Sequence, residues 1–210
     1  MVTYRIDTAT LWEVPQDVAA TWEHVERLER QGPPGDAERV VWLRILGALA
    51  AAERLAWADV ARHGGPAALA DLPAAEPVPA AAWRPLLRLA QVLHRRGLLD
   101  AADAVVDAVR RAAQAAAVVP GVDEVARRDC SAVLAFADQG QGRVRYGTGR
   151  YAEAVHLFSS ALERRTRDGA PGDQVGASRI ALAAASARAA GDPGPATGGT
   201  GPAARARATV

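Results

Sequence analysis

The fold is decided by LAQVLHRRGLLDAADAVVDAV at residues 89–109 and by GRVRYGTGRYAEAVHLFSSAL at residues 142–162. In each stretch a small residue stands seven positions before a glycine: the two pairs are Ala90 with Gly97 and Gly142 with Gly149. An alanine follows each glycine at the fifth position, and a larger apolar residue at the ninth. A small residue lets two helices approach closely, glycine permits the turn, and the larger residues fill the gap. The spacing predicts two antiparallel helical hairpins.

This pattern resembles the tetratricopeptide repeat (TPR), over about residues 83–165. The resemblance implies an all-α fold of antiparallel helical hairpins stacked as a short TPR-like α-solenoid. The chain departs from the family in its period, because Ala102 and Ala154 lie 52 residues apart, whereas the family repeats every 34 residues or about that. A fainter third match starts at Leu46-Gly47 and lacks the turn glycine.

Apolar residues recur with the helical period of about 3.6 residues through most of the chain. Asp17 and Asp36 are N-cap candidates for two N-terminal helices. The first should end before the breaker at residues 32–35, and the second should run to about residue 63 with a break near Ala52. Residues 64–80 contain four prolines and predict a connector with one helical turn. Further helices are expected at about 81–96, 98–117, 123–146, 150–166 and 174–190, whereas only residues 2–6 suit a strand.

These elements suggest three parts of the chain. Residues 1–80 form an N-terminal Trp-rich helical segment and Pro-rich connector, and residues 81–190 form the TPR-like helical hairpins. Residues 191–210 combine Gly, Pro, Ala and Thr with few large apolar groups, which cannot offset the entropy of ordering. We expect a disordered tail there.

Composition excludes some classes of partner and favours one location. The 210 residues carry a net charge of +1, which gives no overall field to attract nucleic acid or an anionic membrane. All 25 basic residues are arginine. A single cysteine, Cys130, cannot form an internal disulfide, and no run of eighteen apolar residues occurs. We expect a cytoplasmic protein with no direct nucleic-acid contact and no membrane span.

The TPR resemblance also implies a binding site, because in that family the first helix of each hairpin lines a concave groove that holds the ligand. The positions that match are Arg84, Leu87, Gln91, His94, Arg95, Phe136, Gln139, Arg143 and Tyr146. Such a basic and amphipathic groove suits an acidic or C-terminal peptide, since a guanidinium group binds a carboxylate through two hydrogen bonds. The alternative is that these arginines are simply solvated surface residues.

Candidate catalytic and metal-binding residues have structural explanations. Asp100, Asp103 and Asp107 share one helical face and could hold Mg²⁺, but they also suit the positive end of a helix and pairing with Arg111. Four scattered histidines show no metal-binding spacing, and no nucleophile motif surrounds Cys130. We therefore expect no enzyme, no metal and no cofactor. A pocket lined by some of the five tryptophans remains an alternative site for a small apolar ligand.

The leading hypothesis is a non-enzymatic TPR-like scaffold or adaptor that binds a peptide or protein partner in its concave groove. An alternative is a regulatory or sensory module of a neighbouring catalytic or DNA-binding protein. A small all-α enzyme is a third. A homo-oligomer that covers the alanine-rich helix at residues 177–190 is also left open.

Overall fold

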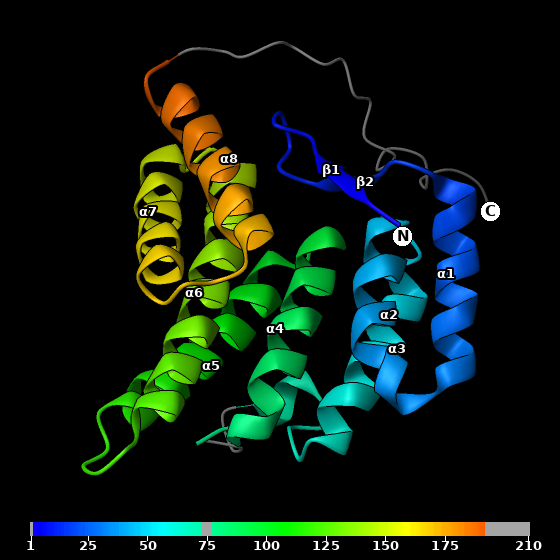
Figure 1. Cartoon of the computed structure of the whole chain (residues 1–210), viewed down its shortest axis with the longest axis horizontal. Coiled ribbons are helices and arrows are strands. Elements are labelled where there is room, and N and C mark those ends of the chain that lie inside the picture. Colours follow the sequence, from blue (N-terminus) through cyan, green and yellow to red (C-terminus); the bar gives the residue numbers. More distant parts are fainter. Residues whose placement is uncertain (1, 73–76, 192–210) are drawn as a thin grey trace, which may run out of the picture.

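The computed structural model describes residues 2–72 and 77–191, which form eight α-helices, one short 3-10 helix and a two-stranded sheet (Figure 1). The prediction of an all-α chain is confirmed. The expected tail falls on residues 192–210, outside the described residues. The elements are β1 (Tyr4–Ile6), β2 (Glu13–Pro15), α1 (Val18–Gln31), α2 (Pro33–Ile45), α3 (Leu49–Arg62), η1 (Leu69–Asp71), α4 (Ala80–Arg95), α5 (Leu99–Ala117), α6 (Glu124–Gly147), α7 (Tyr151–Arg167) and α8 (Gly172–Ala189).

Three helix pairs are joined by turns of the same conformation: α2–α3, α4–α5 and α6–α7. Each turn has a glycine in the left-handed region, with φ of 80°, 79° and 76° at Gly47, Gly97 and Gly149. The next N–H donates to a carbonyl five residues earlier, as Leu98 N does to Leu93 O at 3.0 Å. The alanines five residues after these glycines, Ala52, Ala102 and Ala154, are buried. The expectation that the match at Leu46 lacks a turn glycine is therefore wrong, because Gly47 is that glycine.

The two N-terminal helix boundaries that differ from the prediction both have local causes. α2 begins at Pro33, not Asp36, because proline needs no hydrogen bond in the first turn of a helix. Only Gly32, with φ of 67°, interrupts the chain between α1 and α2. The break expected near Ala52 lies at Gly47, and the alanine run continues as helix.

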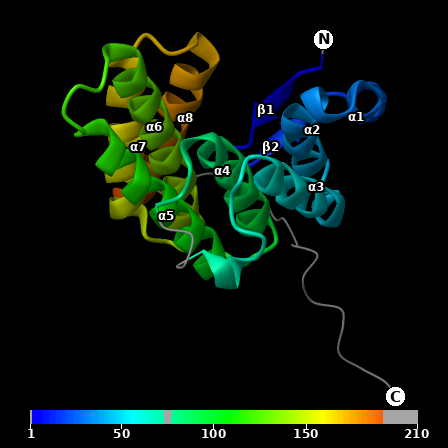
Figure 2. The ribbon, with the colours of Figure 1, turned by 90° about the horizontal axis from the view of Figure 1, so that it is seen from below.

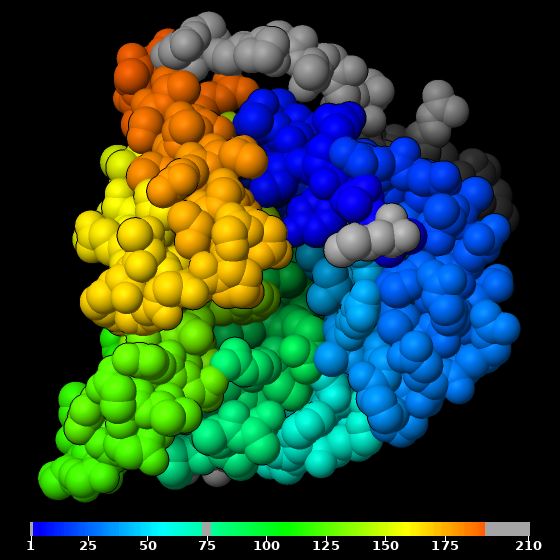
Figure 3. Space-filling view, in the orientation of Figure 1, coloured from blue at the N-terminus to red at the C-terminus, as the bar shows by residue number. Residues whose placement is uncertain are grey.

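β1 falls within the stretch predicted as a strand, but its partner β2 was not predicted. The two strands are antiparallel, with Tyr4 opposite Pro15 and Ile6 opposite Glu13. We call residues 2–16 the N-terminal segment. It lies between α8 and the helices α1 and α2, where its outer side faces solvent (Figures 1 and 3).

Each helix packs against the next one along the chain, and the two views of the ribbon show them side by side in chain order (Figures 1 and 2). Contacts also join α2 to α4, α4 to α6 and α6 to α8. These four helices therefore share one side of the molecule, which we call the shared face. The division expected at residue 80 stays a prediction, although α3 packs against α4 across it. Among the described helices, none is both long and apolar enough to cross a membrane.

Two apolar clusters hold the helices together. The larger extends from α1 to α6 and includes Trp42 and Trp83. The smaller joins Leu11 of the N-terminal segment to Phe158 of α7 and Ala181 of α8. Burial of apolar side chains on both sides of each interface is the main stabilising contribution to such a stack.

Candidate functional site

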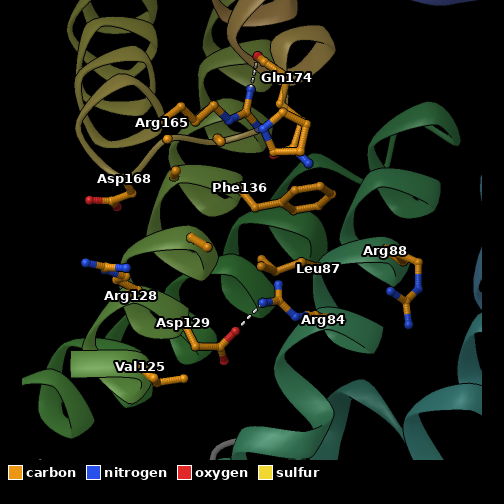
Figure 4. Close-up of a pocket in the computed structure, with 15 residues that line it drawn as sticks. Arg84, Leu87, Arg88, Val125, Arg128, Asp129, Phe136, Arg165, Asp168 and Gln174 are labelled. Atoms are coloured by element: carbon orange, nitrogen blue, oxygen red, sulfur yellow. Dashed lines mark hydrogen bonds and ion pairs between the residues drawn. The ribbon is translucent and has the colours of Figure 1, made fainter. Parts of the chain in front are cut away.

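An open groove of about 570 Å³ lies on the shared face, between α4, α6 and the turn that joins α7 to α8 (Figure 4). Its apolar floor includes Leu87, Phe136 and Ala135, and the exposed side chain of Val125 stands at one end. Four arginines and two aspartates line it: Arg84, Arg88, Arg128, Arg165, Asp129 and Asp168. Four positive charges against two negative ones leave the lining with an excess of two positive charges. The groove is thus apolar at its base and basic at its walls.

Three of these arginines already have acidic partners. Arg84 pairs with Asp129 across the groove, and both side chains are about half exposed. Arg88 lies 2.8 Å from the carboxylate of Asp59. Arg128 pairs with Glu124 of its own helix at 3.1 Å. Exposed pairs of this kind contribute about 0–1 kcal/mol, so a carboxylate of a ligand could replace the acidic partner of Arg84 or Arg128 at little cost.

Arg165 differs, because its guanidinium group bonds only to neutral acceptors in the part of the chain that the structure describes. Its Nη1 donates to Gln174 O at 2.9 Å, to Ser178 Oγ at 2.7 Å and to Gln139 Oε1 at 3.3 Å. Its Nε is buried without a hydrogen-bond partner. Burial, and then the charge of Arg143, lowers the pKa of Arg165 to about 10, so the group remains charged at neutral pH. The groove therefore has a buried positive charge in its wall.

The N-terminal segment covers the part of the shared face next to this groove. Glu13 extends between α2 and α6, where Arg44 Nη1 donates to one carboxylate oxygen at 2.8 Å and Arg143 Nη1 to the other at 2.7 Å. All three side chains are buried. Burial alone would raise the pKa of Glu13, but the charges of Arg143 and Arg44 hold it well below its usual range. The carboxylate is ionised at any physiological pH.

Trp12 and Thr8 add contacts to α4 and α6. The Trp12 ring lies 4.6 Å from the His94 ring, and Arg95 Cζ lies 4.5 Å from the Trp12 centroid, a cation–π contact. The Tyr146 hydroxyl donates to Thr8 O at 3.0 Å. Burial, and then the charges of Arg143 and Arg44, lowers the pKa of His94 to about 4, so its ring is neutral at neutral pH.

The nine residues that the sequence indicates for partner binding form two groups, and two of them, Gln91 and Gln139, lie outside both. Arg84, Leu87 and Phe136 line the open groove. His94, Arg95, Arg143 and Tyr146 contact the N-terminal segment. Gln91 lies between these two groups, in a narrow cavity that it lines together with Leu87 and Phe136. Gln139 is buried and accepts hydrogen bonds from Arg165 and Ser178. The structure thus brings eight of the nine to one face and places Gln139 inside.

Sequence reasoning missed three residues of this face, Glu13, Arg44 and Arg165, and it considered Trp12 only as one of the five tryptophans that could line an alternative apolar pocket. Trp12 and Glu13 precede the first helix, so no repeat pattern reaches them. Arg44 and Arg165 lie on helices whose inward faces were expected to be apolar. Only their placement in space distinguishes them from the other arginines of the chain.

The other residues considered for catalysis or metal binding have structural roles or environments that oppose such chemistry. Asp103 pairs with Arg145 at 2.5 Å, and Asp107 accepts from Gln141 Nε2 at 3.2 Å. Burial, and then the charge of Asp129, raises the pKa of the Cys130 thiol, which opposes nucleophilic reactivity. Within residues 2–72 and 77–191 no three His, Cys, Asp or Glu side chains come together as metal ligands would. Trp42 and Trp83 are buried in the larger cluster, and Trp22 is exposed on α1.

Comparisons of this chain with family models, with curated proteins and with solved structures give no match.

Proposed function

We propose that this chain is a non-enzymatic, TPR-like helical scaffold of the cytoplasm that binds an acidic peptide or protein segment on its shared face. The observation that carries the proposal is the open groove of about 570 Å³, with its apolar floor and its excess of positive charge. Arginine binds carboxylates at fixed geometry, while Leu87 and Phe136 offer apolar contact. An extended segment with acidic and apolar side chains complements both features.

The ion pairs of the groove support an exchange of partners. Arg84 and Arg128 are both half exposed or more, and their carboxylate partners lie on α6. A ligand carboxylate can take the place of either partner without burying a new charge. Arg165 supplies a positive charge that no carboxylate within the described residues neutralises by direct contact, so an acidic ligand gains there without displacing anything.

The test is a selection from displayed peptides of the host's own proteins, followed by calorimetric measurement of the selected peptides. We expect acidic peptides with apolar residues to be enriched. Arg84→Glu/Arg128→Glu should weaken their binding by about tenfold or more, which corresponds to about 1.4 kcal/mol.

Arg54→Glu/Arg179→Glu is the matched control. Both arginines are exposed, they lie on α3 and α8, and neither lines the groove. This variant carries the same change of net charge and should bind within about twofold of the unmodified chain, because long-range effects of exposed charges are screened. Equal loss in both variants would show that net charge alone drives binding, and no enrichment of acidic peptides would contradict the proposal.

A further inference from the structure

Three consecutive side chains, Leu11, Trp12 and Glu13, attach the N-terminal segment to the shared face. Tyr4 also contacts the Trp42 ring, and Val2 and Ile6 pack against the two apolar clusters. Its own backbone hydrogen bonds stay within it, as in Leu11 N to Asp7 O at 2.7 Å and Gln16 N to Thr3 O at 3.1 Å. One backbone group, Thr8 O, accepts from a helix side chain. The segment is therefore a small hairpin that presents a tripeptide to the shared face.

Arg44 and Arg143 form a receptor for a carboxylate whichever chain supplies it. They come from α2 and α6, are 3% and 7% exposed, and each donates to a different oxygen of Glu13. Two guanidinium groups that converge on one buried point repel each other unless an anion lies between them. A planar carboxylate with two hydrogen-bonded oxygens meets this requirement.

The fit of the resident segment is incomplete. A second hollow of about 360 Å³ remains beside residues 9–12 and is lined by Thr148 and Tyr151, among others. On the other side, Leu87 and Phe136 border both the open groove and the narrow cavity under Trp12. Leu11 has φ of 58°, in the left-handed region that residues with a side chain avoid. A longer peptide could therefore keep the three anchor contacts, gain others on both sides and adopt a relaxed backbone.

We propose that Arg44 and Arg143 form a carboxylate-binding site for partner peptides in which an aromatic residue directly precedes a glutamate or aspartate, and that Trp12-Glu13 is its resident competitor. The partner displaces the N-terminal segment and places its own aromatic ring on His94 and Arg95. This goes beyond the proposed function, because the site is separate from the open groove and requires no ligand there.

The test uses the full chain and a labelled peptide with the sequence of residues 7–16. The peptide should bind a Trp12→Ala/Glu13→Ala chain, in which two of the three resident anchors are absent and Leu11 remains. It should bind the unmodified chain about 100-fold more weakly if the segment is undocked in about one molecule in 100, because apparent affinity scales with the competent fraction. A peptide with glutamine in place of its glutamate should bind the double variant at least about tenfold more weakly than the original peptide.

Failure of this proposal is distinguishable from failure of the proposed function. Arg84→Glu/Arg128→Glu, introduced into the Trp12→Ala/Glu13→Ala chain, should leave the affinity for this peptide unchanged. A folded Trp12→Ala/Glu13→Ala chain that does not bind the peptide would overturn the proposal.

If that variant loses its helical circular dichroism, amide hydrogen exchange of the unmodified chain tests instead whether the N-terminal segment detaches from the folded helices. Amides of β1 and β2 that exchange faster than those of α4 and α6, through local opening, support displacement of the segment. Exchange of both sets only through global unfolding would show that the segment is a permanent part of the fold, and would overturn the proposal.

Discussion

Gly142→Ala should destabilise the protein, although alanine is the better helix former. Gly142 lies in α6 where Phe158 of α7 packs against it. A Cβ atom at this position would lie 2.6 Å from Phe158 Cε1 and 2.8 Å from Cδ1. The ring is 0% exposed, so moving it away from the new Cβ atom would disturb its other packed neighbours. Overpacking costs about 1–3 kcal/mol, and two contacts this short put the cost near the upper end. The higher helix propensity of alanine offsets about 1 kcal/mol of this cost, so the free energy of unfolding should fall by about 2 kcal/mol.

Gly140→Ala is the matched control. Gly140 lies in the interior of the same helix, and a Cβ atom there would meet nothing within 4 Å. This variant gains the propensity without the clash and should be more stable by about 1 kcal/mol. The two substitutions are chemically identical and two residues apart, so their difference of about 3 kcal/mol isolates the contact between α6 and α7.

The measurement is urea unfolding followed by far-ultraviolet circular dichroism, with the free energy of unfolding extrapolated to water. Phe158→Leu should restore part of the stability that Gly142→Ala removes, so the double variant should be more stable than the sum of the single effects predicts. If both alanine variants are stabilised alike, the two helices do not approach as described, and the explanation of the Gly142 spacing is refuted.

Two further predictions concern His94 and Gly149. The folded pKa of His94 is about 4, below its ordinary value of 6.5, so His94 contributes stability that is present above pH 6.5 and lost as the pH falls toward 4. The loss is up to about 3 kcal/mol, from about 1.4 kcal/mol per pKa unit. His94→Gln should therefore reduce the dependence of the free energy of unfolding on pH between 6.5 and 4. An unchanged pH dependence in this variant would contradict the lowered pKa of His94. Gly149→Ala should cost about 1–2 kcal/mol of stability, because φ is 76° at this position. Gly147→Ala should be tolerated, because φ is negative there and a new Cβ atom would have only His94 Nε2 nearby, at 3.8 Å. The midpoints of urea unfolding compare the two variants, and equal effects would contradict the left-handed turn at Gly149.

The helices could be predicted because their ends are determined locally. Asp17 and Asp123 accept from backbone N–H groups three residues later, at 2.9 Å and 2.7 Å. Gly97 and Gly149 end their helices in the left-handed conformation that glycine favours. Such signals need only a few neighbouring residues, so the sequence contains them in full.

The sequence could not predict that the N-terminal segment covers part of the shared face, because this contact depends on pairs of residues that are far apart in the sequence. Glu13 binds Arg44 and Arg143, which are 31 and 130 positions away, and nothing local selects these two among 25 arginines. β2 has three residues, too few to show an alternating pattern. Helical spacing was enough to predict that the groove residues share one face. The burial of Gln139 could not be predicted in this way, because it depends on the position of α8, whose Ser178 donates a hydrogen bond to Gln139.

The contacts of the N-terminal segment also determine the order in which the molecule can be completed. Most helix contacts join consecutive elements, so each hairpin can fold soon after it is synthesised. Residues 2–16 are made before the helices, yet their receptor requires Arg143 of α6, and the cluster around Leu11 requires Ala181 of α8. Glu13 and Leu11 therefore lack these native contacts until α6 and α8 have been made. Native docking of this segment can therefore be completed only after α6 and α8 are in place, and until then a chaperone or a partner can reach the tripeptide.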